Sequence, residues 1–419
     1  MAQSAPGTSA GGQNTFSLSQ ILDSIDVHNP GLQQFALKTK ASYAMGDAAK
    51  GWAAPTAGIG LSEFPYASAR PSNGMGTMPR KMLMLRLQQM FPNFTQQKRK
   101  EAYYRSYARQ YADERETMKN GLFAEAKMAY YQGYIAAKKV RITAEQEKQL
   151  KLLIHIAKGR LAYDKATVSD IYKARAKLSD LQSTRIVLRS KVAQAAAVLN
   201  SLMNRPADTP LKIDTAADVM DGSAAILQVD SLFVQEHRSD IRRTSDEIHS
   251  MHLKQEVAAA RHRPVFGLTF DNMRMPGDNQ PAHGSRYMFS AMATLSIPMV
   301  PWSSKSYKSA VQAMDYRIQA MQKMQDHQLQ RALGTIRKDW LNMQSARQEL
   351  QRFQSRVLPA YRKTFQANLH AFSENNGDIY ETLAAWDELT DRRLAYFDKL
   401  AGLLDLRVML EAEMQVYGR

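Results

Sequence analysis

The chain has 419 residues, and its 56 lysine and arginine residues against 40 aspartate and glutamate residues give a net charge of +16. It contains no cysteine, which excludes disulfides, thiolate metal sites, a cysteine nucleophile and a lipidated N-terminal cysteine. The mean hydropathy is -0.45, and no apolar run reaches about 18 residues, so a membrane-spanning α-helix is excluded. Spanning β-strands of about 9–11 residues remain compatible with this composition.

The N-terminal segment lacks the features of a secretory signal. The residues from Met1 to Pro6 contain neither a basic region nor an apolar core. Residues 1–16 are rich in small and polar residues, so we expect a flexible lead. A cytosolic chain and an exported chain from which a signal was removed both fit this end of the sequence.

An internal duplication organises the sequence. At an offset of 208, Asp170-Ile171-Tyr172 corresponds to Asp378-Ile379-Tyr380. The pairs found at an offset of 209 are His28/His237, Pro55/Pro264, Gly58/Gly267, Met90/Met299 and Pro92/Pro301. Because these pairs keep one order of predicted elements, the chain is expected to contain two structural repeats.

Each half begins with the same elements. A helical stretch, Leu32–Lys50 or Ile241–Arg261, ends before a proline. A β-hairpin is then predicted over 54–91 in the first repeat and over 264–298 in the second. The apolar positions that alternate in the last strand are Phe289, Ala291, Ala293, Leu295 and Ile297.

Long helices follow each predicted hairpin, over 95–203 and 303–417. The stretch from Pro92 to Asp170 alone would form a helix of roughly 115 Å. Such lengths are typical of coiled coils and helical tubes, and each half is expected to hold an antiparallel helical hairpin. Pro359 should interrupt the second long helix. The domains are therefore a first repeat over 17–205, a linker over 206–236 and a second repeat over 237–419.

From about Ser17 to Gly418, the sequence resembles the outer-membrane efflux protein family, the TolC-like exit ducts. The resemblance is carried by residues 237–241 (His-Arg-Ser-Asp-Ile), 89–94 (Gln-Met-Phe-Pro-Asn-Phe) and 372–380 (Phe-Ser-Glu-Asn-Asn-Gly-Asp-Ile-Tyr). The last segment is most similar to the heavy-metal (copper and silver) efflux branch. Ser239 stands where the family usually has proline, and Asp164 stands where it has glycine.

The resemblance implies a mainly α fold with a small β part. Three chains would form a 12-stranded β-barrel in the outer membrane, continued into the periplasm by an α-helical tube. The implied function is a passive exit channel of a tripartite efflux system rather than an enzyme. Its implied partners are the other copies of a homotrimer, the lipid bilayer, a periplasmic adaptor (membrane fusion) protein and an inner-membrane transporter, without nucleic acid or cofactor.

Acidic and tyrosine side chains mark the two predicted helical turns, which the resemblance places at the periplasmic gate. The candidate gate residues are Asp170, Asp378, Asp164, Tyr172 and Tyr380. Carboxylates gathered by threefold symmetry repel one another unless they pair with basic groups, which suits a gate closed by ion pairs. Helix N-capping is the alternative role for Asp170 and Asp378, and both roles are compatible.

Aromatic residues cluster where the predicted hairpins meet the helices. They are Trp52, Phe91, Phe94 and Trp302. In a barrel these side chains would lie at the membrane interface. Ordinary core packing is the alternative.

The chain has 23 methionines, among them Met273, Met275, Met288 and Met292 in the second hairpin. Thioethers bind Cu(I) and Ag(I), so a methionine ladder facing a lumen is one interpretation, and flexible core packing is the other. The histidines show no metal-ligand spacing, and no metal site is predicted. No phosphate loop or nucleophile elbow is present, and no catalytic residue is predicted.

A second functional class also fits part of the sequence. A soluble basic coiled-coil scaffold or nucleic-acid-binding protein would account for the positive charge and the long helices. It would not account for two matched hairpins flanked by proline.

Overall fold

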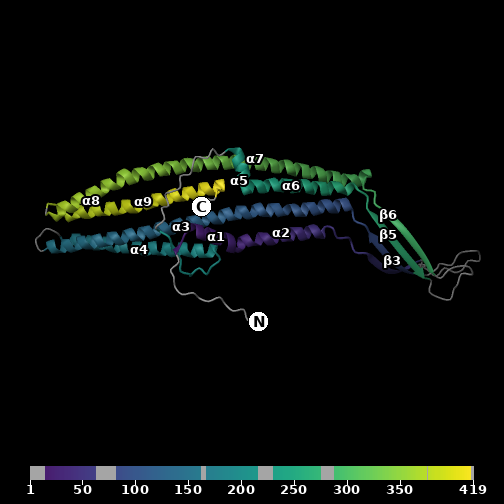
Figure 1. Cartoon of the computed structure of the whole chain (residues 1–419), viewed down its shortest axis with the longest axis horizontal. Helices are drawn as coiled ribbons and strands as arrows, with labels where there is room; N and C mark the ends of the chain where they lie inside the picture. The colour runs from purple at the N-terminus through teal and green to yellow at the C-terminus, as the bar shows by residue number, and fades with distance from the viewer. Residues whose placement is uncertain are drawn as a thin grey trace, which may run out of the picture. The chain divides into compact units, whose positions relative to one another are not determined.

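The computed structural model describes residues 15–62, 82–161, 167–215, 230–274, 287–374 and 376–416. These residues form long α-helices and one four-stranded sheet. The mainly helical architecture expected from the sequence is confirmed (Figure 1).

In the first half, two helices precede a hairpin and a long helical pair. The elements are α1 (Leu18–His28), α2 (Pro30–Ala48), β2 (Thr56–Ser62), β3 (Met82–Met90), α3 (Phe94–Leu161) and α4 (Val168–Leu202). A capping box starts α1, since Ser17 Oγ accepts from the Gln20 amide at 3.3 Å and Gln20 Oε1 accepts from the Ser17 amide at 3.0 Å. Helix α1 ends at His28 because Pro30, which begins α2, cannot continue it.

The second half repeats this order. Its elements are α5 (Ser231–His237), α6 (Ser239–Ala259), a 3₁₀ turn (Ala260–His262), β5 (Phe266–Arg274), β6 (Tyr287–Leu295), α7 (Pro301–Arg352), α8 (Leu358–Ser373) and α9 (Ile379–Met414). A π-helical segment, Phe353–Val357, separates α7 from α8, whose second residue is Pro359. The helix is thus interrupted at the expected place, and the chain accommodates the proline with a π turn rather than a break.

One predicted correspondence between the halves is wrong. Met90 is the last residue of β3, whereas Met299 lies in the turn that follows β6, which already ends at Leu295. The second hairpin therefore leaves a longer connection before its long helix than the first hairpin does, and a single offset cannot align both return strands.

A short parallel pair ties the N-terminal segment to the region between the halves. Strand β1 (Thr15–Phe16) pairs with β4 (Lys212–Ile213). Gly133 of α3 lets this pair approach, because a Cβ there would collide with Ile213 and lie 3.0 Å from the Ala195 Cβ. Residues 15 and 16, at the end of the predicted flexible lead, are thus held against the helices.

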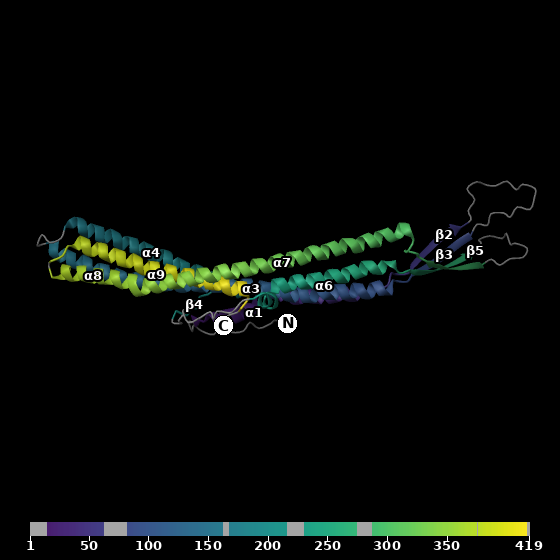
Figure 2. The ribbon, with the colours of Figure 1, turned by 90° about the horizontal axis from the view of Figure 1, so that it is seen from above.

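The four longer strands form one antiparallel sheet in the order β2-β3-β5-β6. Three of them, β2, β3 and β5, are labelled in Figure 2. The two hairpins meet through β3 and β5, whose pairing runs from Leu83 opposite Arg274 to Met90 opposite Gly267. Strands from both halves are therefore neighbours in one sheet, and β2 and β6 form its edges among the described strands.

The chain divides into two compact units that do not follow the sequence halves. One comprises Met1–Phe35, Asp113–Arg242 and Asp326–Arg419, and the other Ala36–Ala112 and Arg243–Gln325. Each unit takes segments from both halves, and α2, α3, α6 and α7 contribute residues to both. The sheet belongs to the second unit and the helical turns to the first.

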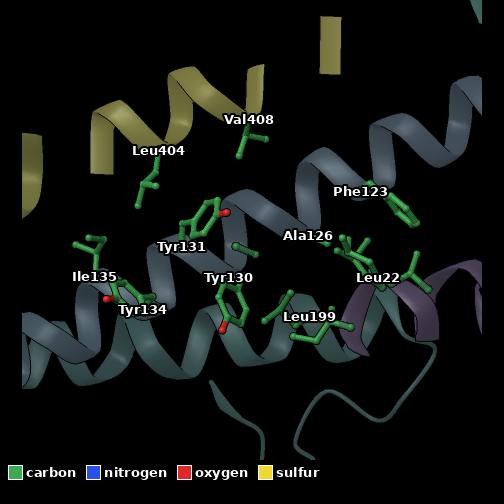
Figure 3. Packing of buried hydrophobic residues seen from close by; sticks show 14 of the residues in the cluster. Leu22, Phe123, Ala126, Tyr130, Tyr131, Tyr134, Ile135, Leu199, Leu404 and Val408 are labelled. Carbon is green, nitrogen blue, oxygen red and sulfur yellow. The ribbon is translucent and has the colours of Figure 1, made fainter. Parts of the chain in front are cut away.

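The largest core of the first unit is built around tyrosines of α3 (Figure 3). Tyr131 lies on the side of α3 that faces Leu404 and Val408 of α9, while Tyr130 points toward α4. The Tyr130 hydroxyl donates to the Asp214 carbonyl at 3.1 Å, and burial raises the pKa of Tyr130 to about 12. Helix α3 is thereby fixed to helices of both halves.

Ser239, which stands where the family that the sequence resembles usually has proline, makes a contact that proline could not make. It is fully buried at the start of α6, and its backbone N–H donates to Gln415 Oε1 at 2.7 Å. Its hydroxyl lies 2.7 Å from the Thr117 hydroxyl. A proline here could not donate the first of these bonds, so serine links the start of α6 to the end of α9.

Two aliphatic residues on α4 provide a matched test of this packing. Leu181 is 7% exposed in a core with Trp386 and Leu389, whereas Ile186 is 69% exposed. Leu181→Ala should lower the free energy of unfolding by about 2–5 kcal/mol, because it leaves a cavity. Ile186→Ala should change it by less than about 0.5 kcal/mol. Chemical denaturation followed by circular dichroism measures both, and equal effects would contradict the assigned burial.

An acidic side chain also joins α3 to α4. The Glu147 carboxylate accepts from Gln182 Nε2 at 3.0 Å and pairs with Lys151 at 2.8 Å and with Arg185. Hydrogen bonding by Lys151, then by Gln182, together with the charge of Arg185, lowers the pKa of Glu147 to about 2.

This pKa sets a pH dependence. A carboxyl group whose pKa is lower in the folded state stabilises the fold above its ordinary pKa and loses that contribution as pH falls. The wild type should therefore lose thermal stability more steeply than Glu147→Gln as the pH falls from 4.5, the ordinary pKa of this carboxyl group, to about 2. Glu145→Gln, which alters a half-exposed pair with Arg141 on the same helix, is the control and should follow the wild type. Identical melting profiles for all three proteins would contradict the assignment.

Candidate functional site

The sheet has one apolar face that is exposed to its surroundings. Cross-strand register places Ile59, Leu85 and Phe289 on this face, and they are 77%, 56% and 74% exposed. The other large apolar side chains of the face are Leu61, Leu83, Leu87, Phe266, Leu268, Phe270 and Leu295. Gln89, Asn272 and Arg274 also lie on this face, which is otherwise apolar. An exposed surface with this many large apolar side chains marks an interaction with a partner or with lipid.

The opposite face carries polar residues, glycines and methionines. An ion pair crosses from β3 to β5, since Arg86 donates to the two Asp271 oxygens at 2.7 and 3.1 Å. Gly58, Thr269 and Ser290 lie on the same face. Alternation along the strands thus separates a largely apolar face from one suited to water.

One of the four predicted interface aromatics, Trp52, contacts two of the others. The Trp52 ring meets Phe91 and Phe94 edge to face, with centroid distances of 5.7 and 5.8 Å. Trp52 and Phe94 remain more than half exposed, and Trp302 is 82% exposed. Because the two tryptophans and Phe94 are this exposed, packing in a protein core does not account for them.

The two helical turns are capped differently. Asp378 is the N-cap of α9 and accepts from the Tyr380 amide at 3.1 Å. Thr167, not Asp170, is the N-cap of α4. Asp170 is the third residue of this helix, and its carboxylate completes a capping box by accepting from the Thr167 amide at 3.2 Å. The expected capping role is thus direct for Asp378 and reciprocal for Asp170, which is 9% exposed.

Glycine is required in the second turn. A Cβ on Gly377 would lie 2.7 Å from the Phe372 amide nitrogen and 2.9 Å from the Ala371 carbonyl carbon. Asp164, the predicted gate residue of the first turn, lies outside the described residues.

The ends of the two helical hairpins pack together. Ile171 and Ile379, which are equivalent in the duplication, share a buried cluster with Ala157 and Phe372. The predicted gate tyrosines lie on the outside of this cluster, where Tyr172 is 62% exposed and Tyr380 is 56% exposed.

Basic side chains connect one hairpin to the other. The Arg160 guanidinium lies 4.2 Å from the centroid of the Phe372 ring and donates to the Ser373 carbonyl at 3.2 Å. Lys173 lies 5.0 Å from the Tyr380 ring centroid, and Lys177 forms an ion pair with Asp387. Burial, then the neighbouring Asp387 carboxylate, raises the pKa of Asp391 on the same helix.

Sequence reasoning missed part of this contact set. Arg160 and Lys177 resemble ordinary solvated residues of a helix, and nothing in their spacing indicates a partner in the other half. The signal that could have found them is the duplication itself, because it predicts two equivalent turns that a threefold or pseudo-twofold assembly brings together.

Other kinds of site find no support in the described part of the chain. No cluster of three histidine or acidic residues suited to a metal ion occurs there. Among the described helices, none is both long enough and apolar enough to cross a membrane.

The fold is that of known outer-membrane channels. No family model matches the sequence, and no curated protein matches it either. Among solved structures, the chain is similar to CusC, a transmembrane channel protein, with a TM-score of 0.74 and 15% identity, covering 97% of this chain and 95% of that one. It is also similar to the outer membrane protein VceC of Vibrio cholerae, with a TM-score of 0.69, 12% identity and 95% of each chain covered.

A third match is the open state of the MtrE outer membrane channel of Neisseria gonorrhoeae, with a TM-score of 0.68 and 14% identity over 95% of this chain and 88% of that one. These matches do not single out the heavy-metal branch. They establish that the chain has the TolC-like channel fold.

Proposed function

We propose that the protein is an outer-membrane channel that serves as the exit duct of a tripartite efflux system. The observation that carries this proposal is the two-faced sheet, whose exposed apolar face suits lipid and whose polar face suits an aqueous lumen. The likeness to outer-membrane channels over nearly the whole chain supports it. The protein conducts substrate passively and does no chemistry.

Three copies form the channel. Each contributes four strands, and pairing of β2 in one copy with β6 in the next gives a closed barrel of 12 strands. Closure leaves no free strand edge, which an open sheet in lipid cannot tolerate. The two repeats, 17–205 and 237–419, each supply one hairpin to the barrel and one helical hairpin to a tube that extends into the periplasm.

The exposed tryptophans mark the membrane boundary. Trp52 and Trp302 adjoin the strand ends and each combines an apolar ring with an N–H group. Side chains of this type concentrate at the level of lipid headgroups.

The helical turns form the gate, with Asp170, Asp378, Asp164, Tyr172 and Tyr380 around it. The closed state is held by contacts between hairpins, of which Lys177 with Asp387 is an ion pair. A periplasmic adaptor, coupled to an inner-membrane transporter, opens the gate by binding the helices and separating these contacts.

The channel and its gate are tested by conductance across planar lipid bilayers. The purified protein should form discrete channels, and Lys177→Ala or Asp387→Ala should raise the open probability. An exposed ion pair contributes about 1 kcal/mol at most. Its removal should therefore change the equilibrium between the closed and open forms of each copy by up to about fivefold in favour of the open form.

Lys399→Ala is the matched control. It removes an ion pair of 2.5 Å with Glu349 that joins helices of one repeat only, and it should leave the open probability unchanged. Absence of channels would overturn the proposed function. Channels whose open probability is the same in Lys177→Ala, Asp387→Ala and wild type would overturn the role of this ion pair in the gate.

A further inference from the structure

The helices meet the sheet at one of its ends. Thr56, the first residue of β2, lies opposite Gln88 near the end of β3, and Phe266, the first residue of β5, lies opposite Leu295, the last residue of β6. The end of β3 in turn pairs with the start of β5. The ends of α2 and α6 and the starts of α3 and α7 therefore adjoin the same end of the sheet.

Basic side chains gather where these helices adjoin the sheet. Six of them are exposed and form no ion pair with any residue that the structure describes. These six, which we call the basic collar, are Lys98, Lys100, Arg261, Arg263, Lys305 and Lys308. The collar is held in place by contacts between the helix ends, since Arg263 Nη1 donates to Thr95 Oγ1 at 2.5 Å and Asn93 Nδ2 donates to the Ala260 carbonyl at 2.7 Å.

The acidic residues of the same helix ends do not balance the collar, because other basic residues already bind them. The pairs are Lys50–Glu101, Arg105–Asp47 and Arg99–Glu256. On α7 the first acidic residue is Asp315, which accepts from Gln319 Nε2 at 2.9 Å. The collar thus presents six positive charges that no described carboxylate pairs with.

Two of these lysines occupy positions that the chain alone does not favour. The start of a helix carries a partial positive charge, so acidic residues are usually found in its first turn. Neither α3 nor α7 has an acidic residue there, and Lys98 and Lys305 follow in the next turn. Both lysines would be stabilised by an anion from outside the chain.

The surroundings of the collar indicate which kind of anion this is. Trp302, which is 82% exposed, precedes Lys305 by one turn of α7. At about 1.5 Å per residue, the collar lysines of α3 and α7 lie within roughly 10 Å of the helix starts, and helical side chains lean toward the N-terminus, here toward the sheet. The headgroup layer of a bilayer is roughly 5–8 Å thick. With lipid around the apolar face of the sheet, these ammonium groups reach the level of the lipid phosphates.

A cavity of about 520 Å³ adjoins the collar between the end of α6 and the start of α7. Its lining includes Ala259, His262, Tyr307, Lys308 and Val311. Lys308 supplies a cation, while Ala259 and Val311 supply apolar surface. Asp315 also lines the cavity. A site that combines a cation with apolar walls suits a phosphate that is attached to an acyl chain better than a soluble phosphate.

We propose that the basic collar binds the phosphate groups of anionic phospholipids in the leaflet that faces the helices. The position of the collar in a membrane rests on the proposed function, whereas lipid binding can be measured without a channel. The proposal also gives a role to part of the net charge of +16.

Binding is tested with the full-length protein in a non-ionic detergent. Isothermal titration with dioctanoyl phosphatidylglycerol should detect binding that weakens as the salt concentration rises, and zwitterionic dioctanoyl phosphatidylcholine should bind less tightly. A basic residue near an anionic membrane surface adds about fivefold to the affinity. The triple variant Lys98→Gln/Lys305→Gln/Lys308→Gln should therefore bind phosphatidylglycerol about tenfold or more weakly than the wild type.

Lys148→Gln/Lys191→Gln/Lys363→Gln is the matched control. It removes the same charge from exposed lysines of α3, α4 and α8, and it should bind phosphatidylglycerol as the wild type does. Equal affinity in all three proteins would overturn the proposal, as would equal affinity of the wild type for the two lipids. Displacement of the lipid by an equal concentration of inorganic phosphate or of a DNA duplex would also overturn it, because the collar would then bind a soluble anion.

A measurement on single residues of the wild type removes any dependence on how the variants fold. An N-hydroxysuccinimide ester modifies accessible lysines, and mass spectrometry assigns the modification to individual residues. Phosphatidylglycerol should protect the three collar lysines, Lys98, Lys305 and Lys308, but not the three control lysines. Uniform protection of both sets would contradict the site.

The outcomes for the collar and for the channel are distinguishable. Channels in planar bilayers without a preference for phosphatidylglycerol would overturn the lipid site alone. Binding of phosphatidylglycerol without channels would overturn the proposed channel alone.

Discussion

The structure depends on one constraint, which is that a single chain can neither pair the edge strands of its sheet nor cover the apolar face. The four strands expose an apolar face and end in two edges, β2 and β6, whose outer hydrogen-bonding groups have no partner strand among the described residues. In water this arrangement would be prone to aggregation, and in lipid each unpaired backbone group would cost several kcal/mol. Pairing with other copies removes the edges, and lipid covers the apolar face. The proposed channel follows from meeting both requirements at once.

The two helical hairpins that arise from the duplication contact each other at their turns. The turns of both helical hairpins belong to the same compact unit, and they share a buried cluster in which Ile171 and Ile379 are equivalent residues. Around that cluster, contacts between the halves are made by exposed or half-buried charged and aromatic side chains such as Lys177 and Asp387. A buried apolar contact surrounded by weak polar ones can rearrange without unfolding the helices, which is what a gate at this end requires.

Much of the fold could be predicted from local sequence, because prolines, alternating strands and helix-forming composition act over short distances. The interrupted helix at Pro359 and both hairpins are such features. The pairing of Met90 with Met299 was wrong because one offset cannot follow connections of different length. The N-cap at Thr167 and the contacts of Arg160 depend on turn geometry and on the other half of the chain. Likewise, the ion pair between Arg86 and Asp271 requires the register between β3 and β5, which joins strands far apart in the sequence.

The central claim is that β2 of one copy lies beside β6 of the next, and chemical cross-linking tests it most directly. Because the chain contains no cysteine, cysteines introduced at Ala57 of β2 and Ala293 of β6 would be its only thiols. A flexible bis-maleimide tolerates uncertainty in register between copies. The account predicts that the double variant in outer membranes gives covalent dimers and trimers with no larger species, and that neither single variant does. A double variant that stays monomeric, or that forms a ladder beyond the trimer, would contradict it.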